Sequence, residues 1–99
     1  MSEDPIAEVG IDADERLYVR PSTSSFDHIY RAGMQVNWEP TGRRLFSPKP
    51  REWTYADWFA QIVEAVSGEY GTTLQLTSYT EWTNVPASLR AEIEAQTVA

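Results

Sequence analysis

Four basic residues and a tryptophan fall within a short window in the middle of the chain, and their spacing favours a binding site. Half of the eight Lys and Arg residues lie between positions 43 and 51, and a tryptophan follows them (Arg43, Arg44, Lys49, Arg51, Trp53). Guanidinium and ammonium groups bind anions, and Arg and Trp side chains are the types that anchor protein interfaces. Three interpretations are open: an anion site near a helix N-terminus, a contact surface for a partner, or cations paired with acids from the two ends of the chain.

Arg16, Tyr18 and Arg20 form a second candidate face. They alternate with Leu17 and Val19 in the stretch RLYVR, so they share one side of a predicted strand. Cations that flank an aromatic ring are typical of platforms that stack single-stranded nucleic acid. The same pattern is typical of a solvent-exposed strand face whose arginines pair with the acidic N-terminal segment, and the composition favours this second interpretation.

The patterns of common catalytic and metal sites are absent from the sequence. It has no cysteine, no Gly-rich phosphate loop and no G-x-S-x-G elbow. His28 is the single histidine, and on a helix the neighbouring Asp27 would point about 100° away from it. The acidic segment Asp12–Glu15 begins like a calcium loop, but Leu17 and Thr23 stand where that loop needs glycine and glutamate. We therefore expect no catalytic residue, no metal and no cofactor, and we interpret Asp12–Glu15 as a turn.

The charge is segregated along the chain, which has a net charge of −7. The first 15 residues carry six acids and no base, residues 16–51 carry seven bases and two acids, and residues 52–99 carry seven acids and one base. A strongly acidic body repels phosphates, so nucleic-acid binding by the basic middle segment is the least favoured hypothesis. The acidic start and the lack of a long apolar run predict neither a secretory signal nor a membrane span, so we expect a soluble cytoplasmic protein.

The apolar pattern predicts a single α+β domain over residues 6–99, preceded by a flexible tail at residues 1–5. Alternation favours short strands within residues 6–12, 16–20, 34–46 and 72–80, so we expect a mostly antiparallel sheet of four or five short strands. The best hairpin pattern is MQVNWEPTGRRLF, where Pro40 and Gly42 break the apolar run. A short helix is predicted between Ser24 and Gly33.

The most regular segment predicts one main amphipathic helix over residues 54–67, packed on one face of the sheet. Its apolar residues recur at helical spacing (Tyr55, Trp58, Phe59, Ile62, Val63, Val66). Thr54 and Asp57 have the spacing of a capping box, and Trp53 and Trp58 have that of a hydrophobic staple. A short C-terminal helix is predicted in NVPASLRAEIEAQ. The triplet EWT occurs at 52–54 and 81–83, and we interpret both copies as the same device for entering a helix.

The leading functional hypothesis is a small, acidic, non-enzymatic binding protein whose partner is another protein, with a homo-oligomer also possible. In size and composition the chain is similar to small acidic bacterial inhibitors and immunity proteins, although no motif carries that similarity. The alternative is a small-molecule or anion binder with an aromatic-lined cleft, and a well-formed pocket would favour it. The expected binding residues are those of the basic window with its tryptophan, and the secondary face is that of the RLYVR strand (Arg43, Arg44, Lys49, Arg51, Trp53; Arg16, Tyr18, Arg20).

Overall fold

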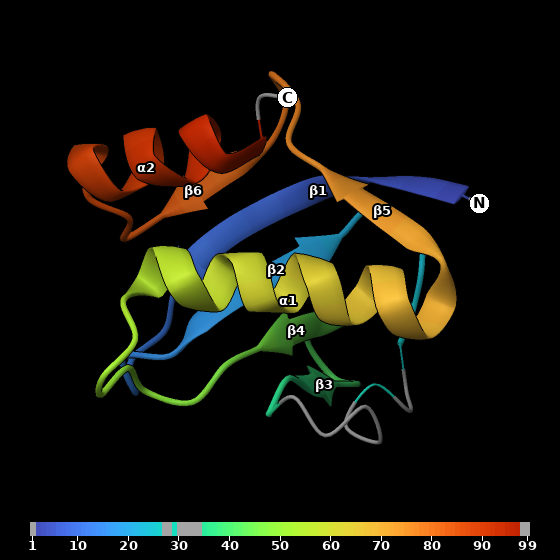
Figure 1. The fold of residues 1–99 in the computed structure, drawn as a ribbon, viewed down its shortest axis with the longest axis horizontal. Helices are drawn as coiled ribbons and strands as arrows, with labels where there is room; N and C mark the ends of the chain where they lie inside the picture. The colour runs from blue at the N-terminus through green and yellow to red at the C-terminus, as the bar shows by residue number, and fades with distance from the viewer. Residues whose placement is uncertain (1, 27–28, 30–34, 98–99) are drawn as a thin grey trace.

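The computed structural model describes residues 2–26, 29 and 35–97, which form a β-sheet and two helices in an α+β fold (Figure 1). The elements follow the order β1 (Ser2–Ile11), β2 (Leu17–Pro21), β3 (Asn37–Glu39), β4 (Arg44–Phe46), α1 (Tyr55–Tyr70), β5 (Thr72–Gln75), β6 (Glu81–Thr83) and α2 (Ala87–Thr97). The predicted fold class, the main helix and the C-terminal helix are confirmed.

Within the described residues, the sheet has six strands and is mostly antiparallel. Its order is β3-β4-β2-β1-β5, and β6 also pairs with β1. The neighbours from β3 to β1 are antiparallel, whereas β5 and β6 both run parallel to β1. The expectation of four or five strands is therefore wrong by at least one, because the second EWT triplet forms strand β6 rather than the entry to a helix.

The long strand β1 organises the sheet. A bulge between Ile6 and Glu8 places an extra residue in β1 relative to β2. Ile6 and Val9, three positions apart, are both buried as a result, with 1% and 0% of their surface exposed. The parallel partner of β1 changes at the same place, since β5 pairs with Ser2–Pro5 and β6 pairs with Glu8–Gly10.

The predicted flexible tail is wrong for residues 2–5, which belong to β1. Asp4 is 1% exposed, and its carboxylate accepts hydrogen bonds from the backbone N–H groups of Thr23 (3.3 Å) and Ser24 (2.9 Å). A buried carboxylate is costly unless it is hydrogen-bonded, and these contacts meet that need. They join residues about 20 positions apart, so the local sequence pattern contains no sign of them.

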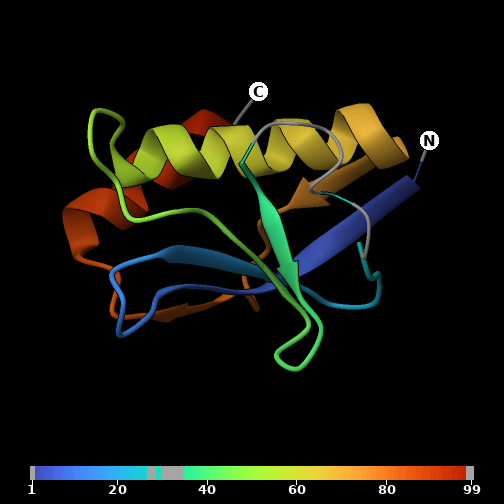
Figure 2. The same cartoon turned by 90° about the horizontal axis from the view of Figure 1, so that it is seen from below.

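Helix α1 lies along one face of the sheet, as Figure 2 shows from a second direction, and α2 packs beside it. The inward row of the sheet runs through Val9, Val19 and Leu45, all 0% exposed, with Trp38 and Trp82 as its partly buried ends. The underside of α1 covers this row with buried apolar residues (Ala56, Trp58, Phe59, Ile62, Ala65, Val66).

Helix α1 begins with the predicted capping box and ends later than predicted. The Thr54 side chain accepts a hydrogen bond from the Asp57 N–H (3.2 Å), and the Asp57 carboxylate accepts one from the Thr54 N–H (2.9 Å), so the capping box is confirmed. The helix runs three residues beyond Ser67. It ends at Gly71, whose left-handed φ of 66° suits glycine.

The β3–β4 hairpin is confirmed, with a turn over residues 40–43. The predicted short helix at residues 24–33 falls largely outside the described residues. Within it, Phe26 and Ile29 are buried, and the Ile29 N–H donates to the Phe26 carbonyl (3.1 Å). Among the described residues, no helix is long and apolar enough to cross a bilayer.

Candidate functional site

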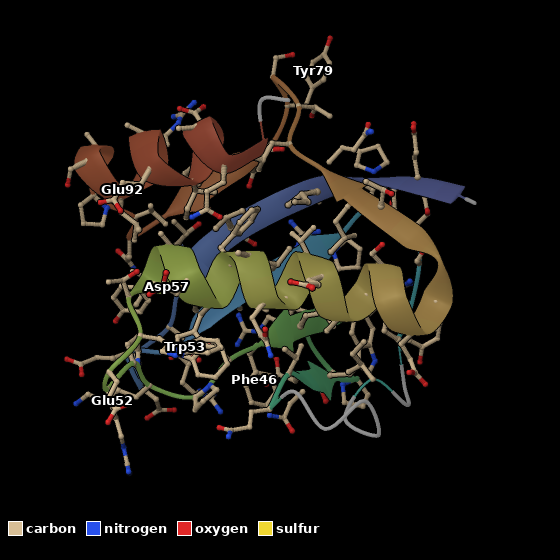
Figure 3. The ribbon with its side chains drawn as sticks, in the orientation of Figure 1. Phe46, Glu52, Trp53, Asp57, Tyr79 and Glu92 are labelled. Atoms are coloured by element: carbon tan, nitrogen blue, oxygen red, sulfur yellow. The ribbon has the colours of Figure 1, made fainter. Side chains whose placement is uncertain are left out.

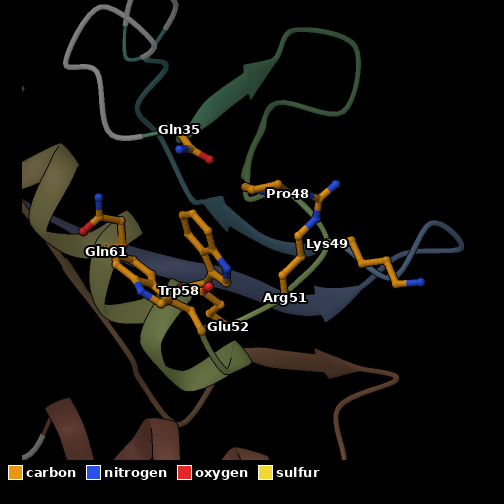
Figure 4. A pocket seen from close by; sticks show the side chains of 8 residues that line it. Gln35, Pro48, Lys49, Arg51, Glu52, Trp58 and Gln61 are labelled. Atoms are coloured by element: carbon orange, nitrogen blue, oxygen red, sulfur yellow. The ribbon is translucent and has the colours of Figure 1, made fainter.

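A hollow of about 800 Å³ opens beside the N-terminal half of α1 (Figure 4). Its described walls come from the second residue before β3, from the segment that leads into α1, and from the first two turns of that helix (Gln35, Pro48, Lys49, Arg51, Glu52, Trp53, Trp58, Gln61). The lead-in segment is held at both ends. The buried Ser47 N–H donates to the Leu17 carbonyl (2.9 Å), and the Tyr55 hydroxyl donates to the Glu15 carbonyl (3.0 Å).

Trp53 and Trp58 form the aromatic wall of this hollow. Their ring centroids lie 4.8 Å apart, as the hydrophobic staple predicts. Trp53 remains 45% exposed, whereas Trp58 is 8% exposed. A smaller hollow of about 310 Å³ shares Trp53 and Gln61 with the first, so Trp53 lines both. Figure 3 labels Trp53 with Glu52 and Asp57 at the start of α1.

The indole N–H of Trp58 is the one buried side-chain nitrogen or oxygen that has no hydrogen-bond partner among the described residues. A buried donor without an acceptor costs about 1–3 kcal/mol relative to a satisfied one. No sequence pattern predicts this unsatisfied donor.

The two cations of the hollow differ in their surroundings. Lys49 Nζ lies 2.6 Å from the Glu15 carboxylate, and this hydrogen bond and the negative charge of Glu15 raise the pKa of Lys49. Both side chains are largely exposed, so the pair contributes little stability. Arg51 makes no ion pair or hydrogen bond to the described part of the chain, and its charge is available to a ligand.

Arg43 and Arg44, the other two residues of the basic window, lie outside the hollow. Arg43 donates a hydrogen bond to the Thr23 carbonyl (3.2 Å). Arg44 pairs with Glu39 (2.8 Å) across the β3–β4 hairpin. The structure thus brings Lys49, Arg51 and Trp53 together and directs the two adjacent arginines elsewhere.

A carboxylate of α1 itself, that of Asp57, lies at the N-terminus of the helix. Asp57 closes the capping box there, so an anion at this end of the helix would meet a negative charge. The arrangement disfavours the interpretation of the basic window as an anion site built on the helix end.

The secondary face of Arg16, Tyr18 and Arg20 lies on the side of the sheet opposite α1, where its cations are paired. Arg16 pairs with Asp12 (2.9 Å). The Tyr18 ring is only 5% exposed, because the Arg44 guanidinium lies over it at 4.3 Å from the ring centroid. This covered ring offers no free stacking surface in the structure.

Glu8 is the centre of a polar network on the same side of the sheet. Its carboxylate accepts hydrogen bonds from the hydroxyls of Tyr18 (2.8 Å) and Thr83 (2.5 Å) and from Arg20 Nε (3.3 Å). Burial by itself raises the pKa of Glu8, but the three donors and the charge of Arg20 outweigh it and hold that pKa below 4.5. Burial and the hydrogen bond to Glu8 raise the pKa of Tyr18.

Asp12–Glu15 forms a turn, as predicted. Asp12 accepts hydrogen bonds from the N–H groups of Asp14 and Arg16 (both 2.9 Å). Burial by itself raises the pKa of Asp12, but the hydrogen bonds and charge of Arg16 and the hydrogen bond from Asp14 lower it by more, so the net shift is downward. Its carboxylate oxygens are therefore engaged within the turn. His28 lies outside the described residues.

The sequence pattern did not identify five residues in the walls of the hollow as site residues (Gln35, Pro48, Glu52, Trp58, Gln61). The staple spacing places Trp58 next to Trp53 and could have indicated one of them. Gln35 and Gln61 come from segments that meet only in the folded chain, so no local pattern relates them.

Comparison with known proteins identifies the family. Residues 4–80 match the family model described as Integron Cassette Protein Hfx_Cass5, a range that includes every described residue of the hollow. No curated protein matches the chain. A solved structure from the mobile metagenome of North West Arm Sewage Outfall, that of Integron Cassette Protein Hfx_Cass5, is 43% identical, covers 100% of this chain and 99% of its own, and has a TM-score of 0.51. The chain therefore belongs to the Integron Cassette Protein Hfx_Cass5 family.

Proposed function

We propose that the chain is a small non-enzymatic binding protein that recognises another protein at the hollow beside Trp53. The observation that carries this proposal is the Trp53 side chain, which is 45% exposed while its ring rests on the buried Trp58. Exposed Trp and Arg side chains that sit next to a well-packed base are typical anchors of protein interfaces. We further propose a cytoplasmic location, which suits a chain without cysteine.

The shape of the hollow favours a protein over a small molecule. Five of its described residues are exposed, and only Trp58 is buried (Gln35, Lys49, Arg51, Glu52, Trp53). Small-molecule sites enclose most of the ligand surface, whereas a shallow surface with a central aromatic residue matches the anatomy of a protein interface. The two carboxylates with lowered pKa values, Glu8 and Asp12, lie outside the hollow. The raised pKa of Lys49, which lines the hollow, comes from its exposed pair with Glu15, so no buried acid or base is found among the described lining residues.

The absence of cysteine allows a site-specific test. A photo-crosslinker is attached to Glu52→Cys at the rim of the hollow and, as a matched control, to Glu92→Cys on α2, which is exposed and lies outside the lining. In extracts of host cells, we expect one protein to cross-link at position 52 and not at position 92. Adding Trp53→Ala is expected to abolish that product while thermal unfolding shows the variant to be folded.

The cross-linked partner is then purified and titrated against the wild type and Trp53→Ala. Loss of an interface anchor weakens binding by about 30-fold or more. Equal cross-linking at positions 52 and 92, no product at either, or undiminished binding of Trp53→Ala would contradict the proposal. Cross-linking to a second copy of the chain would instead identify a homo-oligomer and contradict a separate partner.

A further inference from the structure

We infer that the segment bound in the hollow carries a single carboxylate next to an apolar side chain, an inference that rests on the proposed function. Arg51 is the first ground for it. Each of the other described Lys and Arg side chains has a bond to a carboxylate or a carbonyl within the chain (Arg16, Arg20, Arg43, Arg44, Lys49, Arg90). Arg51 alone among the described cations has none, although it lines the hollow.

The second ground is independent of charge. The wall of the same hollow contains Trp58, whose buried N–H has no acceptor among the described residues. A guanidinium and an indole N–H are both donors, and a carboxylate has two oxygens with which to accept from them. Arg51 is exposed and can donate to such a group directly, whereas the Trp58 N–H is buried, so an acceptor reaches it only if the aromatic wall shifts.

The other residues of the hollow limit the charge of the acceptor group and the kind of side chain beside it. Glu52 lines the hollow, Asp57 lies at the helix end beside Trp53, and the chain has a net charge of −7, so a doubly charged phosphate is repelled more strongly than one carboxylate. The exposed Trp53 ring and Pro48 give an apolar surface beside Arg51. An apolar side chain adjacent to an Asp or Glu meets both requirements.

A pair of short peptides tests this chemistry by NMR. Acetyl-Leu-Asp-amide and acetyl-Leu-Asn-amide have nearly the same shape and differ in charge. We expect the Asp peptide to bind about tenfold more tightly and to shift the indole N–H resonance of Trp58, which the Trp58→Phe variant assigns. Arg51→Gln should remove the preference for Asp, whereas the control Arg90→Gln, an exposed arginine on α2, should leave it unchanged.

Three outcomes would overturn the inference: equal binding of the two peptides, an unchanged preference in Arg51→Gln, or a largest indole shift at Trp82. The proposed function can fail separately. If cross-linking at position 52 depends on Trp53 while the peptides show no preference for charge, the hollow binds a protein but not through a carboxylate. If the peptides behave as expected and no protein cross-links, the carboxylate site exists without a protein partner.

Discussion

At the scale of single residues, the described arginines differ in whether their charge is paired within the chain. Arg16 and Arg20 pair with carboxylates of the N-terminal segment, and Arg44 is held by Glu39 and Tyr18. Composition shows that such pairing is possible, but only the fold decides which cation is left over. Arg51 is left over because its side chain lines the hollow and meets no carboxylate of the described chain.

Glu8 yields a prediction for pH. Its folded-state pKa is lowered, so its contribution to stability is complete above the unfolded value of 4.5 and is lost as the pH falls through the folded value. At pH 7, Glu8→Gln should lower the free energy of unfolding by about 1.5–3 kcal/mol, the usual contribution of hydrogen bonds to a charged group. Urea denaturation between pH 7 and pH 3 should show the difference from the wild type shrinking at the acidic end.

Glu69→Gln is the control for Glu8, because Glu69 is exposed on α1. It should follow the wild-type pH profile. A difference between the wild type and Glu8→Gln that stays constant down to pH 3 would contradict the role given to the Glu8 charge.

At the scale of elements, strands β1 and β2 depend on a close approach that only glycine permits. Gly10 pairs with Tyr18, and a Cβ at position 10 would lie 2.3 Å from the Tyr18 hydroxyl oxygen. The Tyr18 ring is fixed by its bond to Glu8 and by Arg44 above it. It therefore has little freedom to move aside for a larger neighbour.

Gly10→Ala should destabilise the protein by about 1–3 kcal/mol, the usual cost of overpacking. Gly68→Ala is the matched control, since nothing lies within 4 Å of a Cβ at that position in α1. There alanine should stabilise the helix by up to about 1 kcal/mol. Urea denaturation of both variants measures their free energies of unfolding. Equal values for the two would show that the Tyr18 ring moves aside for a Cβ at position 10 without cost.

The elements that the sequence predicted are those whose determinants lie close together in it. Helix α1, with its cap at Thr54 and its Trp53–Trp58 staple, and the hairpin interrupted by Pro40 and Gly42 depend on neighbours a few residues apart. Strand β6 has only three residues and no alternation to reveal it, and its pairing depends on β1 about 70 positions earlier. For the same reason the basic window and Trp53 were recognised from sequence, whereas the glutamines of the hollow were not.

At the scale of the whole molecule, α2 completes the core although the family match ends at residue 80. Ile93 is 0% exposed and belongs to the main core cluster. The Gln96 side chain also donates a hydrogen bond to the Ala56 carbonyl (3.1 Å) on α1. The C-terminal helix is therefore an integral part of the domain.

Ile93→Ala should lower the free energy of unfolding by about 2–5 kcal/mol, the range for truncating a buried aliphatic side chain. Glu92→Ala, an exposed neighbour on the same helix, should change it by no more than about 0.5 kcal/mol. Chemical denaturation of both variants makes the comparison. If the two substitutions have equally small effects, α2 does not contribute to the stability of the domain.

The parallel pairing of β1 with β5 and β6 has a consequence for synthesis on the ribosome. β1 is made before β5 and β6, yet one of its two edges stays unpaired until these strands, which begin at Thr72, are made. At a translation rate of about 5–20 residues per second, the 60 residues between Ile11 and Thr72 leave that edge uncovered for about 3–12 s. An open strand edge can pair with another nascent chain, and the carboxylates of Glu3, Asp4 and Glu8 repel an identical copy during that interval.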